Sequence, residues 1–148
     1  MSRSSSIGAS IKAPVIVDTN VLVAGLLTKR DDSPVAQVLD GMLRASFAFV
    51  VSEALLAEYR SVLVRPGLRK LHGLTVAEID TILTDIAQHA IVLQPVTAPP
   101  APDPGDQMLW ELLTARPELR LITGDKLLLA DAGMVGRVIS PQQFLAAG

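Results

Sequence analysis

Two acidic residues follow apolar runs that are short and β-branched enough to be buried strands. Asp18 comes directly after VIV at 15–17, and Asp125 closes the segment LRLITGD at 119–125. Ligands of a parallel sheet bind at the carboxyl ends of its strands, so both carboxylates would face one edge of the sheet. Each could instead cap a helix that begins after it, because Asp is a favoured N-cap residue. The sequence leaves both interpretations open.

Two further acids lie on or beside the apolar face of predicted helices, where a carboxylate is unexpected. Glu58 is three residues after Leu55 and four before Val62, so it flanks the apolar stripe, whereas Glu53 points away from it. Asp106 precedes apolar residues at +3, +4 and +7, which places it within the apolar face of its helix. An inward carboxylate is unfavourable unless it is paired or bound to a metal ion. The alternative for Asp106 is that it caps this helix.

The four acids would meet at one site if the predicted strand ends and helix faces converge. Closely spaced carboxylates repel one another, and some take up protons unless a cation neutralises them. A set of oxygen ligands without His or Cys selects a hard ion, Mg²⁺ or Mn²⁺, over zinc. Such an ion activates water and stabilises charge on phosphate oxygens. The acids therefore predict metal-dependent hydrolysis of a phosphate ester.

The elements that must position these acids alternate along the chain. Short apolar runs predict strands at 15–17, 47–51, 90–93, 119–123 and 136–140. Stripes at helical spacing predict helices at 20–28, 33–45, 53–64, 75–88, 106–115, 126–132 and 141–147. Residues 95–105 are Pro-rich and predict a loop. Five buried strands alternating with helices predict an α/β fold, with a mainly parallel sheet between two layers of helices.

The composition predicts one globular domain and excludes several kinds of site. The chain has 148 residues, of which 49% are hydrophobic, more than a disordered chain contains. It has no Cys, which excludes disulfides, zinc–thiolate sites, iron–sulfur clusters and Cys nucleophiles. Its apolar runs are too short for a membrane span, and residues 1–12 lack the apolar core of a secretion signal. We expect a flexible lead-in at 1–12, one domain at 13–148, no membrane association and a cytoplasmic location.

The stretches that carry the four acids resemble the motifs of PIN-domain nucleases. VIVDTNVLVAGLL at 15–27 is similar to the opening motif, and VSEALLAEYRSVL at 51–63 is similar to the second. DPGDQMLWELLTA at 103–115 and LITGDKLLL at 121–129 are similar to the third and fourth. The four occur in the family's order over about residues 14–140, which is more specific than any one of them alone. The most similar branch is that of VapC-like toxins from toxin–antitoxin systems.

The resemblance implies a three-layer α/β/α PIN-like domain and endoribonuclease activity that depends on one or two Mg²⁺ or Mn²⁺ ions. By this resemblance, the catalytic and metal-binding acids are Asp18, Glu58, Asp106 and Asp125. The polar neighbours that orient them are Asn20 and Thr123. The resemblance also implies an RNA substrate, a cognate antitoxin protein as partner, and a homo-oligomer, most simply a dimer.

The sequence departs from this branch of the family at two motifs. An acid often follows the Lys of the fourth motif, but Leu127 occupies that place here. The third motif often has a run of acids, which is reduced here to Asp103 and Asp106. Neither change removes one of the four acids. Together they lower the local negative charge and predict weaker binding of a second metal ion.

Basic residues are the only sequence signal for contacts to an RNA substrate. The chain has 13 Lys and Arg against 15 Asp and Glu, and setting four carboxylates aside for metal ions leaves cations in excess. Net charge therefore does not exclude a nucleic-acid partner. The candidate phosphate contacts are Lys29 and Arg30 after the first predicted helix, and Arg65, Arg69, Lys70 and His72 in a predicted basic loop. The alternative is that they form solvated surface.

Other functions are less compatible with the residues. A haloacid-type phosphatase needs a second Asp two residues after the first, where this chain has Asn20. Glycine-rich nucleotide-binding patterns do not occur. The alternative that stays open is a PIN-like RNA-binding or scaffold module without catalysis, and metal-dependent cleavage of RNA would distinguish the two.

Overall fold

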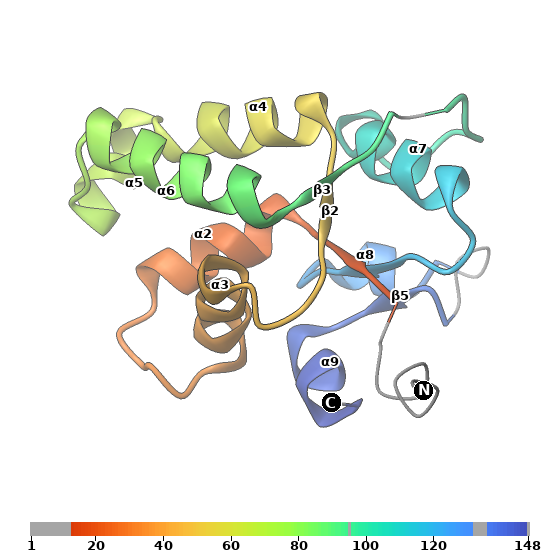
Figure 1. Cartoon of the computed structure of the whole chain (residues 1–148), viewed down its shortest axis with the longest axis horizontal. Coiled ribbons are helices and arrows are strands. Elements are labelled where there is room, and N and C mark those ends of the chain that lie inside the picture. The colour runs from red at the N-terminus through yellow and green to blue at the C-terminus, as the bar shows by residue number, and fades with distance from the viewer. Residues whose placement is uncertain (1–12, 95, 132–135, 148) are drawn as a thin grey trace, which may run out of the picture.

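The strands of the computed structural model run parallel, with β1 at the centre of the sheet (Figure 1). The structure describes residues 13–94, 96–131 and 136–147. The strands are β1 Val15–Val17, β2 Val50–Val51, β3 Ile91–Val92, β4 Arg120–Ile122 and β5 Val138–Ile139. One group has the order β1-β4-β5, and β2 pairs with β3. A parallel bridge between Val15 and Phe49 joins the two groups, which gives the order β3-β2-β1-β4-β5. The predicted parallel sheet is confirmed, with its five strands divided into a group of three and a pair that a single bridge joins.

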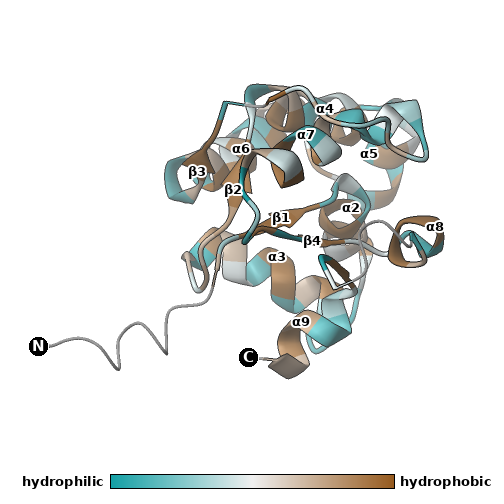
Figure 2. Ribbon diagram, turned by 90° about the vertical axis from the view of Figure 1, so that its right-hand side faces the viewer, coloured by the Kyte–Doolittle hydropathy of each residue, from teal (hydrophilic) through white to brown (hydrophobic). Residues whose placement is uncertain are grey.

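Helices cover both faces of this sheet. Figure 2 shows α4 and α7 on one side of β1 and β4, with α3 and α9 on the other. The helices are α2 Thr19–Leu27, α3 Pro34–Arg44, α4 Glu53–Leu63, α5 Pro66–His72, α6 Val76–His89, α7 Gln107–Ala115, α8 Lys126–Leu129 and α9 Pro141–Ala147, with a 3₁₀ turn, η1, at Pro104–Asp106. This arrangement is the three-layer α/β/α architecture that the sequence predicts.

Three helices begin directly after a polar residue whose side chain caps them. The Ser33 hydroxyl accepts from the third residue of α3, and the Ser52 hydroxyl does the same for α4. Thr75 and Glu78 form a reciprocal capping box at the start of α6. Each such cap satisfies a backbone N–H that has no partner within the helix.

The core is aliphatic and continuous from the sheet to both helix layers. Ile16, Leu22 and Leu113 are fully buried in it, and Trp110 is only 3% exposed. Trp110 is therefore a core residue. At Gly25 of α2, an added Cβ would lie 2.8 Å from a backbone oxygen of α3, so only glycine allows this close approach.

The structure differs from the predicted elements in two places. Residues 66–72 were expected to be a loop, but they form helix α5, because Pro66 is a favoured first helical residue and Gly73 ends the helix at φ 72°. Strand β3 was expected to be buried. It lies at the edge of the sheet instead, where Ile91 and Val92 are 39% and 56% exposed. The expected lead-in at 1–12 lies outside the described residues.

Candidate active site

The central strands bring two of the predicted acids to the same edge of the sheet. Asp18 directly follows β1, and its backbone N–H donates to the carbonyl of Ile122, the last residue of β4 (2.9 Å). Asp125 follows β4 after a two-residue turn. Both therefore lie at the carboxyl ends of adjacent parallel strands, which is the usual ligand-binding edge of such a sheet.

Asp18 does not cap the helix that begins after it. Its side chain makes no capping hydrogen bond to α2. One carboxylate oxygen instead accepts from the hydroxyl of Thr123 (2.8 Å) and the amide of Asn20 (3.2 Å). The Asn20 carbonyl oxygen accepts in turn from the backbone N–H of Gly124 (3.1 Å). Asp18 is only 7% exposed, and these contacts hold its carboxylate in one orientation at the ends of β1 and β4.

Asp125, by contrast, does cap its helix. One of its carboxylate oxygens accepts from the backbone N–H of Leu127 in α8 (2.8 Å). Its own backbone N–H donates to the hydroxyl of Thr123 (3.0 Å), which is the group that also binds Asp18. The capping interpretation is confirmed for this residue. It uses one oxygen and leaves the other available to the pocket described below.

Asp106 lies at the junction of η1 and α7 and was expected either to cap the helix or to bind metal. Its side chain makes no capping hydrogen bond. Asp103 performs the local capping instead, because its carboxylate accepts from the backbone N–H of Gly105 (2.8 Å). The sequence Asp103-Pro104-Gly105 thus starts the turn, and the Asp106 carboxylate makes no capping hydrogen bond to the described residues.

Glu58 reaches the same region from α4, and its helical register is as predicted. Leu55 and Tyr59 of α4 are buried in the core, and Glu53 is exposed to solvent. Glu58 lies between the buried face and the solvent-exposed face of α4, and it lines a pocket of about 450 Å³. The residues that line this pocket are Asp18, Thr19, Asn20, Val23, Ala24, Leu27, Glu58, Val62, Asp106 and Asp125. All four predicted acids share it.

The charges of the four acids act on one another across this pocket. Burial, the largest cause, and the negative charges of Asp18, Asp103, Asp125 and Glu58 together raise the pKa of Asp106 to about 6. Burial also raises the pKa of Asp18, an effect that the Thr123 hydroxyl opposes. Mutual repulsion of this kind is what a cation at the site would relieve.

A buried tyrosine supports the strand that carries Asp18. The hydroxyl of Tyr59 donates to the carbonyl of Val17, the residue before Asp18. Burial and the nearby charge of Asp18 both raise the pKa of Tyr59, so the hydroxyl stays protonated and can donate. The sequence places Tyr59 on the apolar face of its helix but gives no signal for this polar contact.

The donor chemistry of the pocket fits a hard divalent cation. The acids supply oxygen only, and Mg²⁺ and Mn²⁺ prefer oxygen ligands. Besides burial, the charges of the neighbouring carboxylates raise the pKa of Asp106, so these groups lie within electrostatic range of one another. In residues 13–94, 96–131 and 136–147, however, no three His, Cys, Asp or Glu side chains form a ready-made metal-binding group. Binding of an ion by three or more of these acids would therefore require side-chain movement.

A larger cavity lies at the opposite, amino ends of the strands. Its volume is about 540 Å³, and Val15, Leu119 and Phe144 contribute to its lining. Its one acid, Glu118, forms an ion pair with Arg116 (2.6 Å). This cavity has no converging acids and lies at the edge of a parallel sheet where ligands are not usually bound, so it is not the candidate active site.

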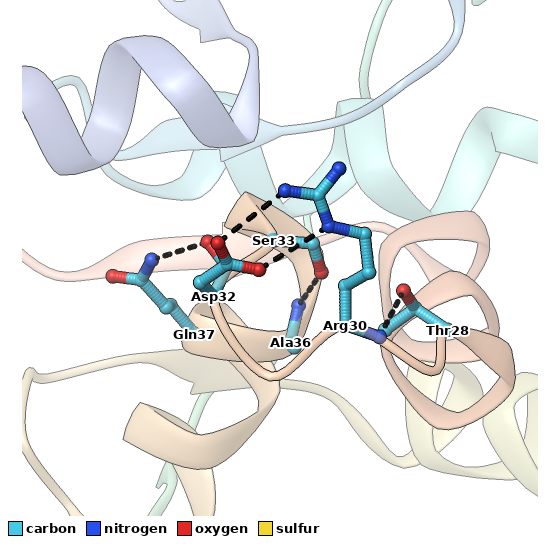
Figure 3. A network of polar contacts seen from close by, with 6 residues as sticks. All are labelled: Thr28, Arg30, Asp32, Ser33, Ala36 and Gln37. Carbon is cyan, nitrogen blue, oxygen red and sulfur yellow. Dashed lines mark hydrogen bonds and ion pairs between the residues drawn. The ribbon is translucent and has the colours of Figure 1, made fainter.

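The predicted phosphate contacts at the end of α2 lie outside the acidic pocket. Figure 3 shows the guanidinium of Arg30 beside the carboxylate of Asp32, with both N···O distances 3.4 Å. The carbonyl of Asp32 also accepts from Gln37 of α3 (2.8 Å), so this network orders the α2–α3 loop. Lys29 is exposed and is not among the residues that line the pocket.

The other predicted phosphate contacts are on α5 and its N-cap. Arg65, Arg69 and Lys70 are exposed, and α5 packs against α2 and α4, the two helices that form one wall of the pocket. His72 has a different role, because its ring nitrogens contact the carbonyl of Leu63 (3.0 Å) and the N–H of Leu74 (3.0 Å). His72 therefore joins the ends of α4 and α5, and both of its ring nitrogens are engaged by these contacts.

The comparison with known families agrees with this site. The family model described as PIN domain matches residues 14–127, which span β1 to the start of α8 and include all four acids. The chain belongs to the PIN domain family. PIN domains are in general nucleases and typically use divalent metal ions, so the family indicates a nuclease-type hydrolase. Among curated proteins, none matches this sequence.

Sequence reasoning missed the apolar half of the pocket. Val23, Ala24 and Leu27 of α2 and Val62 of α4 line it beside the acids. A signal for this was present, because every residue of α2 after Asn20 is apolar or Gly, so the helix has no polar face. An apolar helix that is not wholly buried by the core leaves an apolar surface that a ligand or partner can contact.

Proposed function

We propose that this protein is an endoribonuclease that hydrolyses RNA phosphodiester bonds with Mg²⁺ or Mn²⁺ bound by Asp18, Glu58, Asp106 and Asp125. The observation that carries the proposal is the pocket at the carboxyl edge of the sheet, which all four acids line. Burial and then the charges of the neighbouring acids raise the pKa of Asp106, and a cation between the carboxylates would relieve their repulsion. Membership in the PIN family supports the nuclease class.

The bound cation would lower the pKa of water and stabilise the negative charge that develops on the phosphate. The chain's own residues supply the arrangement. Thr123 and Asn20 fix one oxygen of Asp18, and the backbone cap at Leu127 fixes one oxygen of Asp125. Glu58 and Asp106 have no such hydrogen bonds in the described residues, so they can adjust when an ion binds.

Cleavage of single-stranded RNA tests the proposal directly. Purified protein should cut RNA with Mg²⁺ or Mn²⁺ and stop when EDTA is added. Hydrolysis by water leaves 5′-phosphate and 3′-hydroxyl ends, whereas attack by the ribose hydroxyl leaves a 2′,3′-cyclic phosphate. Asp18→Asn should abolish cleavage without unfolding the protein. RNA binding without metal-dependent cleavage would instead support the non-catalytic RNA-binding module.

The role as a toxin rests on the sequence resemblance, and we propose it on that basis. A toxin needs a cognate antitoxin that blocks its nuclease site. A small protein encoded next to this chain, with a DNA-binding start and a tail that folds on binding, would support the role. Co-expression of the two should suppress cleavage of RNA. The predicted homodimer and cytoplasmic location stay predictions, and no helix among the described residues has the length and apolarity to cross a membrane.

A further inference from the structure

The acidic pocket continues into an apolar surface that the proposed hydrolysis does not use. Val21 and Leu22 of α2 are buried in the core, and Gly25 packs closely on α3. Val23, Ala24 and Leu27, which lie on another side of the same helix, are partly exposed and line the pocket. An apolar helix face that is left open in this way usually contacts a ligand or partner.

The apolar surface leads from the acids toward positive charge. Leu27 is the last residue of α2, and Val62 lies near the end of α4. The backbone N–H of Arg65 donates to the carbonyl of Val62 (3.2 Å), so Arg65 directly adjoins the far end of the pocket. Figure 1 shows α5 beside the C-terminal ends of α2 and α4, and α5 packs against both. The acids thus line one end of the pocket, and Arg65 lies next to Val62 beyond its other end.

The cations at this end are available to a ligand. Arg65, Arg69 and Lys70 are exposed, and none forms an ion pair in the part of the chain that the structure describes. Arg60 of α4, which precedes Arg65 in the chain, is not available in this way because it forms an ion pair with Asp80 (2.7 Å). Unpaired Arg and Lys at the end of a groove suit the phosphates of a nucleic-acid backbone.

We propose that Val23, Ala24, Leu27 and Val62 receive the unpaired nucleobase next to the bond that is cut, and that Arg65 binds the phosphate beyond it. This inference rests on the proposed ribonuclease function. A nucleotide in RNA has the matching order of groups. The phosphate to be hydrolysed would lie at the acids, the apolar face of the base against the aliphatic residues, and the next phosphate at Arg65. A base stacked and paired in a duplex cannot enter such a pocket, so the substrate class is single-stranded RNA.

The lining also defines how the base is selected. The four residues are aliphatic and offer no side-chain hydrogen-bond donor or acceptor to a base edge. The nearby aromatic residues Tyr59 and Trp110 are buried in the core and cannot stack on a base. Selection in this half of the pocket is therefore by size. Ala24 is the smallest of the four residues, so it sets the space for the base.

The test uses a short single-stranded RNA, either intact or with one base removed at each position in turn. The wild type should cut the intact RNA about tenfold faster in kcat/KM than the RNA abasic beside the cleaved bond, which corresponds to roughly 60 Å² of apolar contact. Ala24→Leu should lose this advantage on intact RNA and cut the abasic RNA as the wild type does. Val62→Ala is a second variant in case Ala24→Leu does not fold. It enlarges the pocket and should also reduce the preference for intact over abasic RNA.

Two controls separate the inference from the proposed function. The increase in melting temperature on adding Mn²⁺ should be the same in Ala24→Leu as in the wild type, because the acids are unchanged. Arg65→Gln should raise KM, whereas Arg44→Gln should not, because Arg44 is paired with Asp40 on α3 and is not among the residues lining the pocket.

If the wild type cuts no RNA, the proposed function fails, and fluorescence anisotropy with the same RNAs tests the base site through binding alone. Tighter binding of intact RNA than of every abasic RNA, abolished in Ala24→Leu, would support it. Equal cleavage and equal binding of intact and abasic RNA would overturn it. The apolar face would then be assigned to a protein partner, which Ala24→Leu should displace.

Discussion

Replacing Asp106 by Asn separates the two roles that the sequence allowed for this residue. If its carboxylate binds metal, the substitution removes a ligand and also removes a source of repulsion. If it were only a helix cap, Asn would replace it nearly without loss. The structure shows no capping hydrogen bond from Asp106, so the first outcome is expected.

The size of the effect follows from the raised pKa of Asp106. A pKa of about 6 against an ordinary 3.8 corresponds to about 3 kcal/mol at most, which solvent screening of this half-exposed group reduces to about 1 kcal/mol. Asp106→Asn should therefore raise the melting temperature of the metal-free protein by about 2–4 °C. A cation at 100 times its dissociation constant stabilises the wild type by about 2.7 kcal/mol, or about 5–10 °C. A tenfold weaker site gains only about 1.4 kcal/mol at the same concentration.

Thermal melting at pH 8, with EDTA, Mg²⁺ or Mn²⁺, measures both quantities in one experiment. Glu111→Gln is the matched control, because Glu111 is on the same helix but is not among the residues that line the pocket. It should show the metal response of the wild type. Equal metal-induced shifts in Asp106→Asn and the wild type would refute the assignment of Asp106 as a ligand.

Three further predictions follow from the same contacts. Glu58→Gln should lower kcat/KM for RNA by about 100-fold or more, whereas Glu53→Gln on the exposed side of α4 should leave it unchanged, and similar losses would contradict the helical register. In EDTA, the contribution of Asp106 to the free energy of unfolding should fall as pH rises from about 4 to about 6, because the unfolded state releases the Asp106 proton at lower pH than the folded state does. Chemical denaturation should show a smaller fall in Asp106→Asn. Tyr59→Phe should lower the free energy of unfolding by about 1–3 kcal/mol and reduce activity, and unchanged stability would mean that its hydroxyl does not support Val17.

The parallel sheet and the acids at its edge were predictable because they depend on local patterns. Three β-branched residues before Asp18 and the apolar run before Asp125 specify strands, and parallel strands place their carboxyl ends together. The phase of α4 around Glu58 follows from its apolar stripe. These signals act within a few residues, so the sequence alone contains them.

Features that depend on contacts between distant segments were not predictable. Proline and glycine at 66–67 fit either a break or a helix start, because Pro66 is also a favoured first helical residue, and α5 is seen to form where it packs on α2 and α4. The exposure of β3 depends on its place at the sheet edge, which a run of apolar residues does not reveal. Likewise, whether Asp103 or Asp106 caps the local turn depends on backbone angles that either residue type allows.

The divergence of two strands explains how α4 comes to deliver an acid to the sheet. In the described residues, β1 and β2 meet at a single bridge, where the N–H of Val15 donates to the carbonyl of Ala48 (3.2 Å). Two residues further along β1, the carbonyl of Val17 accepts from the hydroxyl of Tyr59 instead of from a strand. The side chain of Tyr59 thus takes the place of a strand partner. This hydrogen bond fixes the position of α4 relative to the end of β1. Because Glu58 precedes Tyr59 in the chain, the contact that satisfies the strand also holds Glu58 beside Asp18.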